Sequence, residues 1–439
     1  MRAYVDELLQ RGELVVIEKP VSPQFELAAV TKQIQMTSRK AVLFKNVRGT
    51  AMPVVSNLYG SHERLCRLIG ADRNNFCKTW AEVLKKPLGY QPYENVSMPA
   101  DVVSGKLSDL PLITYHERDA GPYFTSAIYL AKDIDTGIPN LSFHRSMFVS
   151  DTEIRSRLGS SHDLAKYQKK AEERNQALDA AILIGTPPEL FLSACYSLPY
   201  DADELELAAK LRGRPMAMRQ CNTVDLRVPV DTEVVIEGRF LPNLRREEGP
   251  FGEFMGNYVP VGLNHVFEVL SVSWRREAYF HSITCGTPED LCPLEAMTAA
   301  RIYEHVSRVV SGVIDVSTHP NCMISIIKIK KQYDGHGRHA LLAALGSNMD
   351  YNKVCIAVDA DVDIYNLDDV MWAYLTRGRA DTRAFIINDV PGFYRDDHKD
   401  HWGRLAIDAT MPWGREAEFE RKQIPGENTI RLADYLNGT

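Results

Sequence analysis

The 439-residue sequence predicts a mixed α/β (α+β) protein with an α/β domain over residues 1–105, a β-rich domain over 106–300 and a second α/β domain over 301–439. Three observations support this prediction. The length exceeds what one ordinary hydrophobic core accommodates. The first and last parts alternate helical periodicity with short β-runs, whereas the middle part is a series of β-runs with few helices. A mostly antiparallel sheet or barrel suits such a series.

In the first domain, helix-like and strand-like stretches alternate. Helices are expected at residues 1–13, 23–36, 61–70 and 74–86, and strands at 14–19 and 41–47. The stretch PADVVSGKLSDLPLI, residues 99–113, resembles a loop and marks a plausible boundary.

The middle domain consists mainly of β-runs. Strands are expected at residues 124–133, 141–150, 180–185, 233–240 and 265–284, and helices at 163–178 and 204–213. Between the last two β-runs lies LPNLRREEGPFGEFMGNYV, residues 241–259. Its three glycines and its proline at 250 predict a sharply bent loop, so a core strand is not expected there.

The third domain returns to α/β alternation. Helices are expected at residues 300–310, 339–347 and 367–378, and strands at 313–317, 322–331, 353–361 and 384–389. VDADVD, residues 358–363, opens like a calcium loop but lacks the glycine and glutamate of an EF-hand. We therefore expect a strand end there, with Asn366 capping the next helix. The conformation after about residue 395 is left open.

Composition excludes several classes of function. The net charge of −7 and the pI near 6.0 argue against nucleic acid as the main partner, because phosphate neutralisation needs a basic surface. No apolar run approaches the roughly 20 residues of a membrane span, and the N-terminus lacks the apolar core of a signal peptide. The eight cysteines form no CxxC pair, which favours reduced core residues and a cytoplasmic protein.

The loop at 241–259 carries three acids, Glu247, Glu248 and Glu253. A bent loop between two β-runs is a good place to hold carboxylates beside a pocket, although a solvated hairpin tip is equally consistent. An earlier stretch, NLSFHR, contains Arg145 on the same expected strand face as Phe143. That arginine either reaches water at a sheet edge or is buried and needs a carboxylate partner.

Two further polar stretches have ordinary structural explanations when each is taken alone. SSHD, residues 160–163, reads as a helix N-cap with an incidental His162, and Glu204 lies in the first turn of its helix, where the dipole favours a carboxylate. Together with Asn140 they supply an amide oxygen, an imidazole and a carboxylate, a set that suits Mn²⁺ or Mg²⁺. Likewise, Arg145 between Glu248 and Glu253 would hold one acid ionised and leave the other able to carry a proton.

The order of these motifs resembles one family. N-x-S-x-x-R, S-H-D, E-L-E-L-A-A-K-L-R-G and E-G-P-F-G-E-F-x-G follow one another as in the UbiD family of reversible decarboxylases, which use prenylated FMN. EGPFGEFMGNY is the most specific piece. SIIKIKKQYDGHGRHAL and VDADVDIYNLDDVMWAYLTR are also similar to family segments, so the resemblance covers nearly the whole chain. It implies a central split β-barrel that binds flavin.

The resemblance also implies roles for individual residues. Metal ligands that tie the cofactor phosphate to the protein match Asn140, His162 and Glu204. Positions that line or hold the flavin match Thr125, Ser142, Phe143, Arg145, Ser161 and His162, and the phosphate lysine matches Lys330, or Lys328 on the same strand face. The catalytic acid–arginine–acid network matches Arg145, Glu248 and Glu253, with Glu253 as the proton donor.

The sequence departs from the family pattern at a few of these positions. The family often has glycine, tyrosine and glutamine where Ser142, His144 and Ser161 stand. These changes affect cofactor packing and remove no ligand or catalytic group. The chain is also on the short side for the family, so we expect a C-terminal helix that often crosses a dimer interface to be trimmed or absent.

We therefore expect a non-oxidative decarboxylase of an aromatic, heteroaromatic or α,β-unsaturated carboxylic acid. The expected cofactors are prenylated FMN and Mn²⁺ or Mg²⁺, with K⁺ as a further candidate ion. The expected partners are a flavin prenyltransferase as cofactor supplier and further copies of the chain, as a homodimer or higher homo-oligomer. A metal-dependent hydrolase with Glu248 and Glu253 as an acid/base pair is the alternative, and an inert scaffold is a third possibility.

Overall fold

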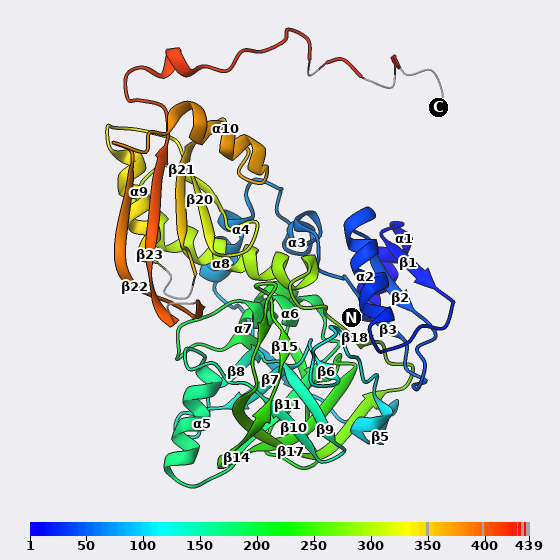
Figure 1. Cartoon of the computed structure of the whole chain (residues 1–439). Coiled ribbons are helices and arrows are strands. Elements are labelled where there is room, and N and C mark those ends of the chain that lie inside the picture. Colours follow the sequence, from blue (N-terminus) through cyan, green and yellow to red (C-terminus); the bar gives the residue numbers. More distant parts are fainter. Residues whose placement is uncertain (348–350, 397–398, 428, 432–433, 436–439) are drawn as a thin grey trace. The chain divides into compact units, whose positions relative to one another are not determined.

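The long strands of the middle region form one antiparallel sheet that closes into a split β-barrel (Figure 1). The strand order is β6-β9-β10-β17-β14-β11-β7-β8, and β5 adds to β17. These strands are β6 (Tyr123–Phe124), β9 (Ser146–Ser150), β10 (Glu153–Ser156), β17 (Gly262–Arg275), β14 (Val234–Glu248), β11 (Leu178–Ile184), β7 (Ile128–Lys132), β8 (Pro139–Phe143) and β5 (Val102–Gly105).

The computed structural model describes residues 1–347, 351–396, 399–427, 429–431 and 434–435. The chain divides into two units, residues 1–304 with 317–323, and residues 305–316 with 324–439. The first unit contains the barrel.

The barrel closes where the chain steps directly from β8 to β9. These strands lie near opposite ends of the strand order, and only His144 and Arg145 separate them in sequence. The expectation of one continuous strand over 141–150 is therefore wrong. A strand that leaves one end of a curled sheet and enters the other must bend, and this bend sets the position of Arg145.

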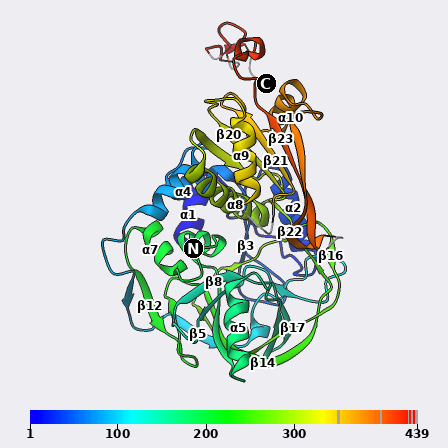
Figure 2. The same ribbon diagram turned by 90° about the vertical axis from the view of Figure 1, so that its left-hand side faces the viewer.

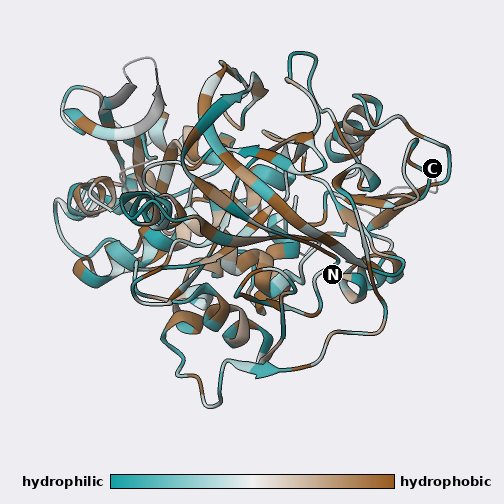
Figure 3. Cartoon of the chain, turned by 90° about the horizontal axis from the view of Figure 1, so that it is seen from below, coloured by the Kyte–Doolittle hydropathy of each residue, from teal (hydrophilic) through white to brown (hydrophobic). Residues whose placement is uncertain are grey.

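Aromatic rings fill the interior of the barrel. The ring centroids of Tyr129, Phe240 and Phe267 lie 5.1–5.7 Å apart, and all three side chains are buried. Figure 3 shows hydrophobic and hydrophilic residues interleaved along the ribbons. Alternation of this kind places one set of side chains in the core and the other at the surface.

The acid-rich stretch is more regular than its glycines predict. Strand β14 continues to Glu248 and pairs again with β17 beyond a register shift between Phe240 and Arg245. The bend expected over residues 241–259 therefore begins only at Gly249. Residues 241–248 continue β14 beyond a bulge, but most of their side chains are exposed or half-buried, so they form no core strand, as expected. The turn itself begins at Gly249 and continues as a small hairpin of β15 (Phe251–Gly252) and β16 (Tyr258–Val259).

The N-terminal residues build a four-stranded sheet in the same unit. Its order is β1-β2-β3-β18, so its last strand follows the barrel strands in the sequence. The run expected at 265–284 is thus two strands, β17 and β18, and the boundary loop expected at 99–113 contains β5 and a 3₁₀ turn, Leu107–Asp109. The sheet comprises β1 (Leu14–Ile17), β2 (Ala41–Phe44), β3 (Val54–Ser56) and β18 (Phe280–His281).

The remaining elements of this unit are helices and a small sheet. The helices are α1 (Arg2–Gln10), α2 (Glu26–Thr37), α3 (His62–Ile69), α4 (Phe76–Lys85), α5 (Asp163–Glu173), α6 (Pro188–Cys195) and α7 (Glu204–Arg212). The small sheet joins β13 (Arg227–Pro229), β12 (Met216–Gln220) and β4 (Tyr93–Asn95). Helix α8 (Pro288–Val309) begins earlier than the helix expected at 300–310, and it contains Pro293 in its second turn.

The second unit is a five-stranded sheet with two helices (Figure 2). Parallel pairs join β20 to β21 and β21 to β23, and β22 is antiparallel to β23. Its elements are β19 (Val313–Ser317), β20 (Ile324–Ile329), α9 (His336–Leu345), β21 (Val354–Asp359), α10 (Leu367–Arg377), β22 (Ala384–Asp396), β23 (Lys399–Ala409) and a 3₁₀ turn, Glu416–Phe419. Asn366 caps α10 as expected, accepting from the backbone of Asp368.

Among the described residues, no helix has the length and apolar content that crossing a bilayer requires. All eight cysteines are free thiols, and five of them are buried.

Candidate active site

Arg145 lies between the two acids of the acid-rich stretch. Its Nε and Nη2 donate to the two carboxylate oxygens of Glu248, at 2.9 and 2.7 Å, and its Nη1 donates to Glu253. The Arg145 side chain is 10% exposed, so the buried reading of this arginine holds and the edge reading does not. Burial opposes the guanidinium charge, but the hydrogen bonds to Glu248 prevail and raise the pKa of Arg145.

The two glutamates occupy different backbone settings. Glu248 ends β14 and is fully buried, whereas Glu253 follows the β15 strand and keeps 15% of its side chain exposed. Gly256, with φ +84°, closes a tight turn by donating to the carbonyl of Glu253. Gly249, with φ +96°, makes the bend after Glu248, where other side chains would be strained.

Two residues of this network were missed by sequence reasoning, Tyr123 on β6 and Asn264 on β17. The Tyr123 hydroxyl donates to Oε1 of Glu248 at 2.8 Å, and the Asn264 amide donates to Oε2 at 2.8 Å. Burial, together with the Glu248 charge, raises the pKa of Tyr123 far above its usual range. No local motif signals either residue, because β6 and β17 meet the acids only through barrel pairing.

Phe251 and Asp119 support the loop that carries the acids. The Phe251 ring packs on Tyr123 with centroids 4.4 Å apart, and the Arg145 guanidinium lies 5.3 Å from the Phe251 centroid. The carboxylate of Asp119 accepts from the backbone of Gly252 at 2.8 Å. The loop is thus held by an aromatic contact to β6 and by a partly buried hydrogen bond to Asp119.

A second, partly buried cation lies in the same neighbourhood. Burial and the charge of Arg145 lower the pKa of Arg157 to about 10, and the charges of Glu253 and Glu248 oppose that shift. The carbonyl of Arg157 also contacts Nδ1 of His144 at 3.2 Å. The corner therefore holds two guanidinium groups and two carboxylates.

Asn140 and Glu204, two predicted metal ligands, lie close together. Asn140 is on β8, and the next residue, Leu141, donates its amide to the Glu204 carboxylate at 3.1 Å. Both side chains are buried. Glu204 is the first residue of α7, as expected, and Asp203 caps that helix.

His162 approaches the same strand through His144. Asn140 accepts from the Ser142 hydroxyl at 2.9 Å, and that hydroxyl contacts Nε2 of His144 at 3.0 Å. The rings of His144 and His162 have centroids 5.2 Å apart. His162 itself occupies the N-cap position of α5, and its side chain makes no capping hydrogen bond.

The charge around Glu204 is compatible with a cation. Burial raises the pKa of Glu204 to about 8, and its charged neighbours, Asp203 and Asp163, are both acids. Among the described residues no salt bridge to Glu204 is found, and its carboxylate is buried beside other acids. Within the described residues, no group of three His, Cys, Asp or Glu side chains is placed to bind a metal ion. The predicted ligand set contains only two such residues, His162 and Glu204, and its third ligand is the amide of Asn140.

The residues expected to line the flavin come from the same barrel corner. Thr125 follows β6, and its hydroxyl contacts Tyr115 at 2.8 Å and accepts from the backbone of Ile283 at 3.1 Å. Phe143, at the end of β8, packs edge-on against Phe191 with centroids 5.1 Å apart. Ser161 is exposed beside His162. An aromatic wall flanked by hydroxyl groups is a surface that suits a planar ring system.

Lys328 and Lys330 belong to the other unit of the chain. Lys328 is on β20, and Lys330 follows the end of that strand and is exposed. Their part in phosphate binding stays a prediction.

The start of α8 also borders the acids. Gly286 lies against the backbone of Glu253, where an added Cβ would be 3.4 Å from its carbonyl. Asp290 accepts from the Gly286 amide at 2.7 Å and from the Cys285 thiol at 3.1 Å. Burial, opposed by these hydrogen bonds, raises the pKa of Asp290 to about 6.

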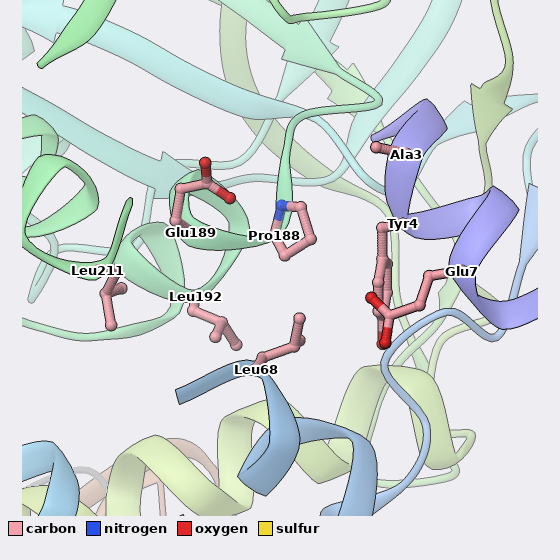
Figure 4. A pocket seen from close by; sticks show the side chains of 8 residues that line it. All are labelled: Ala3, Tyr4, Glu7, Leu68, Pro188, Glu189, Leu192 and Leu211. Carbon is pink, nitrogen blue, oxygen red and sulfur yellow. The ribbon is translucent and has the colours of Figure 1, made fainter. Parts of the chain in front are cut away.

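A separate pocket of about 190 Å³ lies among α1, α3, α6 and α7. Figure 4 shows Tyr4 and Glu7 on one side of it and Glu189, Leu192 and Leu211 on the other. Glu7 and Glu189 both form ion pairs with arginines. None of the predicted site residues lines this pocket.

Comparisons with known proteins agree with this fold. Family models of 3-octaprenyl-4-hydroxybenzoate carboxy-lyase match residues 5–84 (N-terminal domain), 91–288 (Rift-related domain) and 293–409 (C-terminal domain). The chain is 30% identical to the anhydromevalonate phosphate decarboxylase of Methanothermobacter thermautotrophicus, over 96% of this chain and 99% of that protein.

Solved structures of UbiD-class enzymes have a similar fold. The UbiD-class enzyme HmfF of Pelotomaculum thermopropionicum, in complex with FMN, has a TM-score of 0.94 and 32% identity, with 99% of each chain covered. An evolved dimeric form of HmfF, in complex with prFMN (prenylated FMN), has a TM-score of 0.90 and 31% identity, again with 99% of each chain covered.

The fold and the comparisons define the class of protein. The chain belongs to the UbiD family and is a carboxy-lyase. The expected mixed α/β fold with a central split β-barrel is confirmed.

Proposed function

We propose that this protein is a non-oxidative decarboxylase of an aromatic, heteroaromatic or α,β-unsaturated carboxylic acid, and that it uses prenylated FMN and Mn²⁺ or Mg²⁺. The observation that carries the proposal is Arg145, which bonds both Glu248 and Glu253 at the barrel corner. Family membership supports it, as do the similar enzymes that bind FMN or prFMN.

Each residue of the acid–arginine–acid set has its own part in the proposed reaction. Prenylated FMN, when bound, supplies the electron sink for the pair that departing CO₂ leaves behind. Arg145 pairs with the substrate carboxylate and orients it, since a guanidinium matches a carboxylate bidentately. Glu248 holds Arg145 in place. Glu253, the more exposed acid, protonates the carbon that loses CO₂.

The cofactor would be held from two directions. Asn140, His162 and Glu204 would bind the divalent ion that holds the cofactor phosphate, and the buried Glu204 carboxylate supports this assignment. Thr125, Ser142, Phe143 and Ser161 would border the ring system, and Lys330 or Lys328 would reach the phosphate. We also propose a flavin prenyltransferase as cofactor supplier, a homo-oligomeric assembly and a cytoplasmic location.

The test is to coexpress the chain with a flavin prenyltransferase, record its absorption spectrum and screen candidate acids for CO₂ release. A flavin-like band with CO₂ release is the expected result. A colourless protein with metal-dependent hydrolytic activity would instead support the hydrolase alternative, with Glu248 and Glu253 as its acid/base pair. If the protein turns over neither carboxylic acids nor hydrolysable substrates, the inert scaffold is the remaining possibility.

A further inference from the structure

The carboxylate of Glu248 has a donor at every acceptor position. Oε1 accepts from Arg145 Nε at 2.9 Å and from the Tyr123 hydroxyl at 2.8 Å. Oε2 accepts from Arg145 Nη2 at 2.7 Å and from the Asn264 amide at 2.8 Å. An ionised carboxylate offers about four lone-pair sites, so the four donors use all of them.

A proton on Glu248 would disrupt this arrangement. The new O–H would occupy one of the four sites and face a donor already there. Neither the Arg145 guanidinium nor the Asn264 amide nitrogen can accept a hydrogen bond, and if the Tyr123 hydroxyl accepts one, its own proton loses its acceptor. In a fully buried site no water replaces the lost bond, so the protonated form carries the cost of an unpaired donor.

Tyr123 is a dependable donor in this site. Its hydroxyl is buried, and burial with the Glu248 charge raises its pKa far above the working range of an enzyme. Its ring is fixed against Phe251, 4.4 Å between centroids. Tyr123 therefore stays protonated and donates to Glu248 at neutral pH.

Glu253 is in a different environment. It accepts from Nη1 of Arg145, it lies on a turn, and its side chain is partly exposed. A proton on Glu253 would therefore lie on a partly exposed side chain, whereas a proton on Glu248 would meet donors from β6, from β17 and from the connection between β8 and β9.

We propose that Tyr123 and Asn264 are positioning residues that keep Glu248 ionised, so that the exchangeable proton of the acid pair resides on Glu253. The proposal deepens the proposed function, on which it rests, because it explains why one of two glutamates on the same arginine carries the proton. Neither residue contacts the reacting atoms. Each acts through Glu248.

The experiment removes the two neutral donors without removing a charge. Tyr123→Phe deletes only the hydroxyl, Asn264→Leu is close in size, and the double variant removes both. Tyr129→Phe is the matched control, because Tyr129 is an equally buried barrel tyrosine whose hydroxyl contacts Ser146 instead of a carboxylate. All four variants are prepared with the cofactor loaded by coexpression, and circular dichroism confirms folding.

The first readout is the pH profile of kcat/KM for CO₂ release. Each neutral donor to a charged acceptor is worth about one pH unit, so the acidic limb moves up by about one unit in each single variant. In the double variant it moves further, and the two limbs of the profile approach each other. Tyr129→Phe leaves the profile in place. Unmoved limbs in both single variants would overturn the proposal.

The second readout does not need activity. Infrared difference spectra over a pH titration detect protonated carboxyl groups, and the bands are assigned by their loss in Glu253→Gln and Glu248→Gln. The wild type is expected to show the Glu253 band, and the double variant to gain a Glu248 band. A Glu248 band of equal size in wild type and double variant overturns the proposal even if no acid is decarboxylated. Absence of CO₂ release with the expected bands would contradict the proposed function alone.

Discussion

Arg145 and Glu248 form a bidentate pair inside the barrel, with Nε and Nη2 donating at 2.9 and 2.7 Å to the two oxygens of a fully buried carboxylate. The third nitrogen of the guanidinium is thereby aimed at Glu253. Because Glu248 occupies one edge of the planar Arg145 guanidinium, the other edge is left for Glu253 and for the substrate.

Glu253→Gln is expected to lower kcat by about 10²–10⁴-fold, because the amide cannot deliver the proton that general acid catalysis requires. The loaded protein should keep its flavin-like absorption. Glu247→Gln is the matched control, since Glu247 is exposed on the neighbouring position of β14. Steady-state CO₂ release checks both variants, and undiminished decarboxylation by Glu253→Gln would refute the assigned proton donor.

Arg145→Met should lower the free energy of unfolding by about 3–5 kcal/mol, because it leaves the Glu248 carboxylate buried without its cation. Adding Glu248→Gln should recover part of the loss. Arg155→Met, which breaks a more exposed pair with Glu153, should cost only about 1 kcal/mol or less. Denaturant unfolding of the single and double variants checks this, and equal losses for Arg145→Met and Arg155→Met would contradict the prediction.

Removal of a predicted metal ligand should weaken Mn²⁺ binding. Asn140→Leu is expected to reduce affinity by at least about tenfold, since it deletes one of three protein ligands. Glu206→Gln, two residues along α7 from Glu204 and ion-paired with Lys210, should leave binding unchanged. Calorimetric titration of metal-free protein with Mn²⁺ measures both. Tight Mn²⁺ binding by Asn140→Leu would remove this residue from the site.

Asp290 should make stability depend on pH. Burial raises its pKa from an ordinary 3.8 to about 6, so its contribution is fully present below pH 4 and is lost as the pH rises through about 6. The loss is at most about 3 kcal/mol. Asp290→Asn cannot ionise, so its stability relative to wild type should rise across this window, whereas Asp6→Asn on the exposed face of α1 should not show this rise. Denaturant unfolding at pH 4 to 7 measures the difference, and parallel curves for Asp290→Asn and wild type would exclude the effect.

Local patterns were sufficient for much of the chain. The Asn366 cap, the position of Glu204 in the first turn of α7 and the barrel-like series of strands were all read correctly from residue type and spacing. Such features depend on a few consecutive residues and on elementary backbone chemistry, so neighbouring parts of the fold do not alter them.

Other features depend on contacts that no local window contains. The strand expected over 141–150 breaks at His144 and Arg145 because the sheet closes there, and β14 continues to Glu248 because β17 pairs with it beyond a bulge. Propensity alone favours a continuous strand in the first case and a loop in the second. In both, long-range pairing overrides local preference.

The sequence by itself determined which polar groups the protein has available for chemistry, namely an arginine, a pair of glutamates five residues apart and a set of oxygen and nitrogen ligands. Only the tertiary structure decided how the two glutamates differ, by bringing Tyr123 and Asn264 to Glu248 and leaving Glu253 partly exposed on a turn. The physical reason is that an acid's preferred charge state depends on the donors and the solvent around it, and barrel closure supplies those donors from distant strands.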